Sequence, residues 1–130
     1  MSWEMGQSER DALLGVSGPK RYAYFVKKVV DHGEIWLLSY QEGVVLASDG
    51  DREILPVWPH EEFASICADG PWHDAYPKKV ELLKWLEQWS YEMRSDQRSI
   101  AVFPTPDGRG VVVKADRLAE DLRNELANYL

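Results

Sequence analysis

A single cysteine and six tryptophans constrain the fold of this 130-residue chain more than any other feature. Cys67 has no second cysteine to pair with, which excludes an internal disulfide and any zinc or iron–sulfur site made of several cysteines. A domain without such cross-links must be stabilised by burying large apolar side chains. The tryptophans supply them. We therefore expect one domain, residues 1–130, built around an aromatic core.

The chain is acidic. It holds 22 Asp and Glu residues against 15 Lys and Arg, a net charge of −7. A surface of that sign repels phosphate backbones, so we expect no nucleic-acid partner. Residues 1–11 show neither the basic nor the apolar region of a secretory signal, and no apolar run reaches the roughly 18–20 residues that span a bilayer. We therefore expect a cytoplasmic protein without a membrane partner.

Apolar residues recur at helical spacing in five segments. The predicted helices cover residues 8–16, 19–32, 59–68, 77–94 and a last segment from 115 or 116 to the end. We expect Ser8 to cap the first helix through the N–H of Asp11, and Gly33 to end the second. The fourth helix has the clearest apolar stripe, about 100° wide. That stripe consists of Leu82, Trp85, Leu86, Trp89 and Met93. We expect both of its tryptophans in the core.

Between these helices the pattern is typical of strands. The predicted strands cover residues 34–40, 44–47, 53–58, 99–105 and 111–114. Short turns join neighbouring strands and imply antiparallel pairing. The fold class is therefore α+β: a small antiparallel sheet of about five strands covered by helices, in the order ααβββααββα.

The residues capable of chemistry do not show the spacing of a known catalytic or metal site. His60 opens a string similar to a zinc-peptidase helix, but Ala64 stands where the second histidine is needed. A site formed in three dimensions by His60, Cys67 and His73 is conceivable. However, Cys67 shares its predicted face with apolar residues, which favours a small core residue. Its place near the end of a helix also disfavours a thiolate. We expect no metal, no cofactor and no catalytic residue.

Two similar strings lie at the ends of predicted strands. Leu55–His60 reads LPVWPH and Val102–Asp107 reads VFPTPD. Rigid aromatic residues beside prolines and polar side chains suit a binding surface. If the two strands are neighbours, the strings form one rim; otherwise the prolines protect sheet edges from pairing. The candidate binding residues are Trp58, Pro59, His60, Trp72, His73, Phe103, Pro104 and Asp107.

The predicted helix over residues 19–32 carries the most basic stretch of this acidic chain. Its cations are Lys20, Arg21, Lys27 and Lys28. Such a run usually forms a solvated face. The alternative is a contact with an acidic partner.

Several strings are distinctive in combination. They are residues 36–38 (WLL), 55–60 (LPVWPH), 63–68 (FASICA), 102–107 (VFPTPD) and 110–113 (GVVV). Over roughly residues 18–126, the chain resembles a bacterial family of small uncharacterised proteins, domain of unknown function 2750. The resemblance implies a bacterial, cytoplasmic, single-domain protein, and implies no activity, ligand or catalytic residue. The hairpin, the Pro-Val-aromatic string and the following helix are also similar to the SseB-type domain of bacterial secretion and toxin-immunity neighbourhoods.

These observations favour a non-enzymatic protein-interaction module, regulatory or immunity-like, that binds an unknown protein partner through the rim. Its acidic charge would aid solubility and speed encounter with basic partners. The alternative is a small-ligand-binding protein or an enzyme using His60 beside Trp58, which a deep pocket with a perturbed carboxylate would favour. A third reading is a homodimer that uses the same strings.

Overall fold

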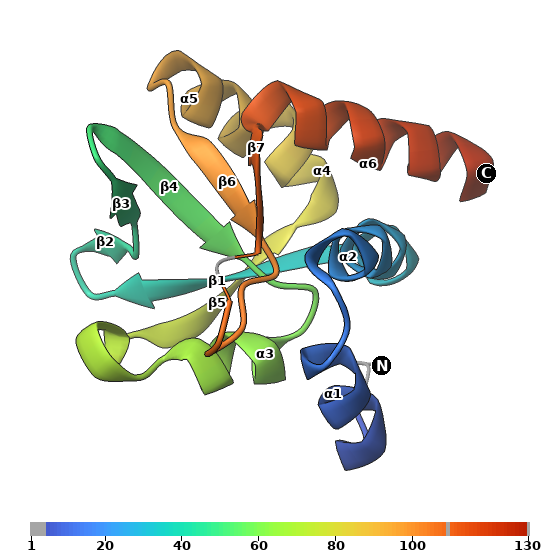
Figure 1. Ribbon diagram of the computed structural model, residues 1–130. Coiled ribbons are helices and arrows are strands. Elements are labelled where there is room, and N and C mark those ends of the chain that lie inside the picture. The colour runs from blue at the N-terminus through green and yellow to red at the C-terminus, as the bar shows by residue number, and fades with distance from the viewer. Residues whose placement is uncertain (1–4, 109, 130) are drawn as a thin grey trace.

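The computed structural model describes residues 5–108 and 110–129 (Figure 1). The helical segments are α1 (Gln7–Leu14), α2 (Gly18–His32), α3 (Glu61–Cys67), the 3-10 turn η1 (Gly70–Trp72), α4 (Leu82–Lys84), the π-helical η2 (Trp85–Trp89), α5 (Ser90–Ser95) and α6 (Ala115–Tyr129). The strands are β1 (Glu34–Tyr40), β2 (Gly43–Val44), β3 (Ala47–Asp49), β4 (Arg52–Val57), β5 (Tyr76–Glu81), β6 (Ser99–Val102) and β7 (Val111–Lys114).

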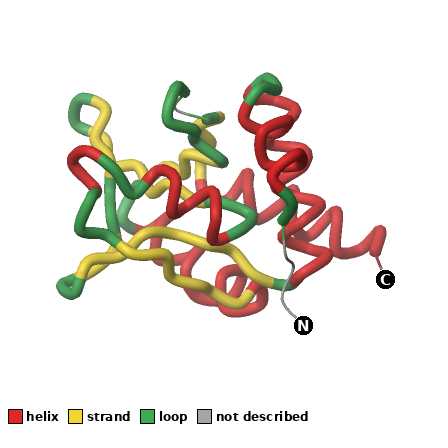
Figure 2. The backbone as a smooth tube through the Cα atoms, turned by 90° about the horizontal axis from the view of Figure 1, so that it is seen from below, coloured by secondary structure: helices red, strands yellow, loops and turns green. Residues whose placement is uncertain are grey.

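These strands form two sheets, so the α+β class is confirmed but the expectation of one antiparallel sheet is wrong. The first sheet has the order β2-β1-β5 and is antiparallel. The second has the order β3-β4-β6-β7, in which β4 and β6 run parallel. Trp36 and Trp58 exchange backbone hydrogen bonds of 2.9 and 2.8 Å, which join the two sheets. Figure 2 shows the strands gathered on the side of the molecule away from the C-terminal end of α6.

The prediction of one helix over residues 77–94 is wrong in its first third. Tyr76–Glu81 forms β5, and the helix begins only at Leu82. Strand β5 pairs with β1 at six successive positions, from Glu34 opposite Glu81 to Ser39 opposite Tyr76. Without that partner, one edge of β1 would leave backbone groups unpaired. The need to pair β1 therefore overrides a local pattern that suits either structure.

One predicted strand is divided in the structure, and another ends earlier than expected. The segment 44–47 divides at Val45 and Leu46, because β2 pairs with β1 whereas β3 pairs with β4. The strand predicted over 99–105 ends at Val102, since Phe103 has a positive φ of 58° that leaves the extended region. The chain therefore passes from one sheet to the other in the first case and turns back toward β7 in the second.

One helix boundary matches the prediction and another corrects it. Gly33 caps α2 in the left-handed conformation, with φ 71°, as predicted. The N-cap of α1 is Gly6, and no side chain caps this end of the helix. The prediction that Ser8 caps α1 is wrong, because Ser8 lies inside the first turn.

The main core lies between the larger sheet and helices α2 and α6, which pack together on one side of β6 and β7 (Figure 1). The sheet contributes Leu55 and Val57 from β4, opposite Ile100 and Val102 of β6, and all four are fully buried. Alternate residues of a strand face opposite sides of a sheet. The residues between them therefore point away from this core.

The tryptophans of the described residues divide between the interior and its margin. Trp58 and Trp85 are fully buried, which confirms Trp85 as a core residue. Trp89 stacks on Trp85 with ring centroids 6.2 Å apart but stays partly exposed, so the core prediction holds only in part for Trp89. Among the helices of the described chain, none combines the length and the apolar character that crossing a bilayer requires.

Candidate binding groove

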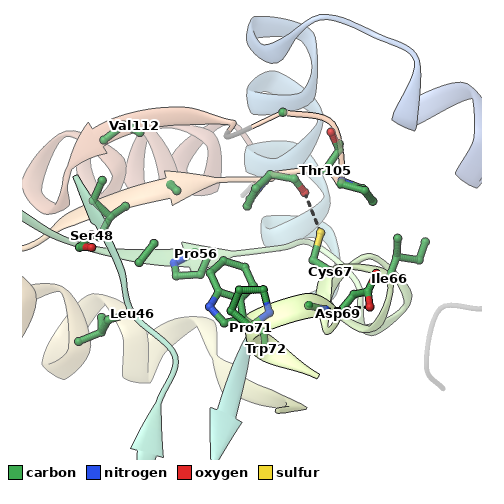
Figure 3. Close-up of a pocket in the computed structure, with 17 residues that line it drawn as sticks. Leu46, Ser48, Pro56, Ile66, Cys67, Asp69, Pro71, Trp72, Thr105 and Val112 are labelled. Atoms are coloured by element: carbon green, nitrogen blue, oxygen red, sulfur yellow. Dashed lines mark hydrogen bonds between the residues drawn. The ribbon is translucent and has the colours of Figure 1, made fainter. Parts of the chain in front are cut away.

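An open groove of about 670 Å³ lies on the face of the larger sheet that is turned away from α2 and α6 (Figure 3). Ile54 and Pro56 are two residues apart on β4, so they share this face. Ala47 lies opposite Ile54, Ala101 opposite Pro56, and Val112 opposite Ala101. All five residues line the groove. Its floor is therefore an apolar surface carried by four paired strands.

One wall of the groove comes from the end of α3 and from η1. Ile66, Cys67, Pro71 and Trp72 give it an apolar surface. Asp69 N-caps η1, and its carboxylate accepts a hydrogen bond of 2.8 Å from the N–H of Gly70. Asp69 is exposed and is the one charged side chain among the described residues that line the groove.

A second wall, next to the first, is the turn over residues 104–108. Thr105 and Gly108 exchange backbone hydrogen bonds of 2.8 and 3.1 Å, which close the turn. The carbonyl of Pro104 accepts a hydrogen bond of 2.9 Å from Nε1 of Trp58 and a weaker one of 3.5 Å from the thiol of Cys67 (Figure 3). This carbonyl therefore ties the turn both to the core and to the other wall.

The structure brings the strings 55–60 and 102–107 together, since β4 and β6 are neighbours. Their aromatic residues turn inward, however: Trp58 and Phe103 are fully buried. The ring of Phe103 packs on Phe63 with centroids 4.6 Å apart. The expectation that these aromatics form an exposed rim is therefore wrong, because their apolar area completes the core.

The other predicted binding residues are dispersed. Pro104 and Trp72 line the groove. Pro59 is buried outside it, whereas His73 and Asp107 are exposed and do not line it. Only two of the eight candidates thus belong to this site.

His60 begins α3 and does not line the groove. Its Nδ1 accepts a hydrogen bond of 3.1 Å from the N–H of Glu62, which is the geometry of an N-cap. His73 lies in the loop after η1, with Nε2 3.2 Å from the carboxylate of Asp74. In the part of the chain that the structure describes, no three His, Cys, Asp or Glu side chains come together as a metal site would require.

The thiol of Cys67 is the group in the groove wall that most resembles a nucleophile. Burial raises its pKa to about 11, more than the contact with Trp58 lowers it. Since the thiolate is the reactive form, the thiol stays protonated and unreactive near neutral pH. Cys67 therefore contributes shape and apolar surface to the groove.

Sequence reasoning missed most of the groove floor. Ile54, Ala101 and Val112 look like ordinary strand residues, and they face the groove only because β4, β6 and β7 pair in this register. One signal was present: β4 and β6 are apolar at every position from 54 to 57 and from 100 to 102. Strands of that kind need cover on both faces.

Together, fold and site define a small α+β domain with an apolar groove on the open face of its larger sheet. The chain belongs to the family described as protein of unknown function (DUF2750), whose sequence profile matches residues 22–122. The match runs from α2 into α6 and includes every described residue that lines the groove. A comparison with curated proteins finds no match. The family resemblance expected from the sequence is therefore confirmed.

Proposed function

We propose that this protein is a non-enzymatic interaction module of a regulatory or immunity-like kind. Its groove binds an extended, apolar segment of a partner protein that carries a basic residue next to that segment. The observation that carries the proposal is the groove itself: an apolar floor on four paired strands, with one carboxylate at its edge.

The groove is suited to an apolar segment because its surface is already organised. Pro56, Pro71, Pro104 and Pro106 all line it, together with Trp72. Proline has few conformations to lose, and the floor is held by strand pairing. Burying apolar area here would therefore favour a complex, with little loss of conformational entropy in this protein.

Charge complementarity supports a basic residue on the partner. Asp69 stands at the edge of the groove, and no lysine or arginine is among the described lining residues. The whole chain carries a net charge of −7. An exposed ion pair adds only about 0–1 kcal/mol, so this charge would govern the rate and specificity of binding more than its strength.

The enzymatic alternative around His60 has less support. The Nδ1 of His60 accepts a backbone hydrogen bond at the start of α3, and the side chain does not reach the groove. Cys67 does line the groove, but its raised pKa keeps it in the unreactive form. A small apolar ligand and a second copy of the chain are alternative occupants of the groove, and the following experiment distinguishes both.

The test places a photo-crosslinking amino acid at Ser48, an exposed lining residue, in the native host. Ser95, exposed at the end of α5, is the matched control position. We expect an adduct with one protein at position 48 and not at position 95, mapped to an apolar stretch beside lysine or arginine. The adduct should be lost with Ala101→Phe, which fills the groove from its floor, and retained with Ala23→Phe on the exposed side of α2.

Three results would overturn the proposal. They are an adduct formed only with a second copy of the chain, an adduct that persists with Ala101→Phe, and a bound small molecule that blocks crosslinking of position 48 to any protein. Circular dichroism of both phenylalanine variants checks that each is folded, so that a lost adduct reports on the groove.

A further inference from the structure

Backbone carbonyl groups in both walls of the groove already accept hydrogen bonds. The carbonyl of Asp69 accepts one of 3.0 Å from the N–H of Trp72. The carbonyl of Pro71 accepts one of 3.2 Å from the hydroxyl of Tyr40. The wall carbonyls with at least one such bond are those of Cys67, Asp69, Gly70, Pro71, Pro104, Thr105 and Gly108. A segment bound in the groove therefore meets few free backbone acceptors for its own N–H groups.

The floor of the groove offers no backbone partner to such a segment. Its residues lie side by side on paired strands, with Ala47 opposite Ile54 and Ala101 opposite Pro56. The hydrogen bonds between strands lie in the plane of the sheet, so a segment resting on the face cannot join them. Each N–H group that the segment buries against this apolar floor would stay unpaired, which is costly.

The side chains that line the groove do offer hydrogen-bond donors. Within the described part of the chain, Nε1 of Trp72 makes no hydrogen bond, and neither do the hydroxyls of Ser48 and Thr105. The fully buried polar side-chain atoms without a partner are Glu62 Oε2 and Trp85 Nε1 among the described residues, so Nε1 of Trp72 keeps contact with solvent. Figure 3 shows the three lining residues on different elements around the groove. An indole N–H can only donate, so it suits a carbonyl of the occupant.

We propose that the segment bound in the groove is proline-rich and adopts the polyproline II conformation; this inference rests on the proposed function. Proline has no N–H, so a proline-rich segment can lie on the apolar floor without burying an unpaired donor. A polyproline II helix makes no internal hydrogen bonds, which leaves its carbonyls free to accept one from Trp72. It is also largely preformed, so little conformational entropy is lost on binding.

Asp69 sets the position of a basic residue beside the proline-rich segment. Its Oδ1 accepts the hydrogen bond of 2.8 Å from the N–H of Gly70, whereas Oδ2 accepts none from the described residues. The carboxylate is exposed at the edge of the groove, in the same wall as Trp72. A lysine or arginine next to the prolines can therefore reach Oδ2 while the prolines stay on the apolar surface.

The test is an array of short synthetic peptides, each with one arginine, probed with the labelled protein. Half of the peptides have proline at alternate positions, the other half have valine at the same positions, and the remaining positions are random but exclude proline. Valine keeps the apolar character but restores the N–H group and favours an extended strand. We expect the tightest peptides to come from the proline half, with dissociation constants in solution about tenfold lower than those of the best valine peptides.

NMR of the labelled protein with the tightest proline peptide tests the hydrogen bond from Trp72. We expect the indole N–H proton signal of Trp72, assigned from its loss in Trp72→Phe, to move downfield and to saturate. The indole signal of Trp89, a partly exposed tryptophan outside the groove, should not move. Trp72→Phe should weaken binding of this peptide about fivefold, and Trp89→Phe should leave it unchanged.

The outcomes separate this inference from the proposed function. Valine peptides that bind as tightly as proline peptides, with both lost in Ala101→Phe, would overturn the inference and leave the proposed function standing. No binding by either half, or binding that Ala101→Phe leaves unchanged, would overturn the proposed function as well. Unchanged affinity in Trp72→Phe, with circular dichroism showing a folded protein, would contradict the hydrogen bond to the peptide and with it the inference.

Discussion

Nε1 of Trp58 donates a 2.9 Å hydrogen bond to the carbonyl of Pro104, which connects the ends of two strings that are 46 residues apart in sequence. Both groups are buried. The bond holds the turn over residues 104–108 against β4 and so fixes one wall of the groove. The groove therefore depends on a hydrogen bond from Trp58, a core residue that does not itself line the groove.

Trp58→Phe tests this relationship. The change removes a buried donor and leaves a small cavity, so we expect a loss of about 2–4 kcal/mol in the free energy of unfolding. Urea unfolding followed by circular dichroism measures it. Trp72→Phe, at a half-buried position of the wall formed by α3 and η1, is the control and should cost less than about 1.5 kcal/mol. An equal effect of the two changes would show that the Trp58 bond does not stabilise this region.

Substitution of Gly110 tests how closely the backbone after β6 approaches that strand. Its φ is +75°, and an added Cβ would lie 2.4 Å from the carbonyl oxygen of Val102. Gly50 has a similar φ of +65° but no atom within 4 Å of that point. We expect Gly50→Ala to cost about 1–2 kcal/mol from its backbone conformation alone, and Gly110→Ala to cost roughly 2–5 kcal/mol. Thermal unfolding compares them; similar losses would mean that the close approach is absent in solution.

The stacked tryptophans Trp85 and Trp89 should differ in their contributions. Trp85 is fully buried, so Trp85→Ala should destabilise the protein by about 3–5 kcal/mol. Trp89 is partly exposed, so Trp89→Ala should have a clearly smaller effect. Urea denaturation of both variants provides the comparison. A larger loss for Trp89 would contradict the packing of this helix.

Ionisation of the Cys67 thiol should lower the free energy of unfolding at alkaline pH. Its pKa rises from an ordinary value of 9.0 to about 11 on folding, mainly through burial. The stabilisation linked to its protonation is complete below pH 9 and is lost as the pH rises through about 11, because the unfolded chain releases the proton first. The free energy of unfolding should therefore fall more between pH 8 and 10.5 in the wild type than in Cys67→Ala. Identical pH profiles from urea unfolding would argue against the raised pKa.

That comparison needs the Cys67→Ala variant because two tyrosines respond to pH in the same range. Burial and hydrogen bonds to carboxylates raise the pKa values of Tyr22 (with Asp121) and Tyr24 (with Glu9). Their contributions are the same in both proteins. The difference between the two pH profiles then reports on Cys67 alone.

The local sequence was enough to predict those elements whose residue pattern fits only one type of secondary structure. The strand over residues 34–40, the strand over 111–114 and the end of α2 at Gly33 are where the pattern places them. The pattern of residues 76–81 suits either a helix or a strand, and pairing with β1, which is distant in sequence, makes them a strand. Likewise, the parallel pairing of β4 with β6 joins segments that are separated by several helical segments and by β5 of the other sheet, and turn signals do not report such a pairing.

The candidate site was harder to predict than the fold, because a groove is defined by what stays uncovered. The strings at residues 55–60 and 102–107 lie at the ends of neighbouring strands, β4 and β6. Their most conspicuous residues, Trp58 and Phe103, fill the core instead. Ala101 and the nearby prolines Pro56, Pro104 and Pro106 line the groove instead. The side of the sheet on which Ala101 and Pro56 lie follows from the pairing register of β4 and β6, which a single sequence does not reveal.

Selection of peptides from a random phage-displayed library tests most directly whether the groove recognises an apolar segment beside a basic residue. The wild-type protein and Ala101→Phe serve as alternate targets, with Ala23→Phe as the folded control. We predict that the wild type and Ala23→Phe enrich apolar peptides with a lysine or arginine, that Ala101→Phe does not, and that Asp69→Asn removes the basic preference. Equal enrichment on Ala101→Phe, or no enrichment on the wild type, would contradict the account.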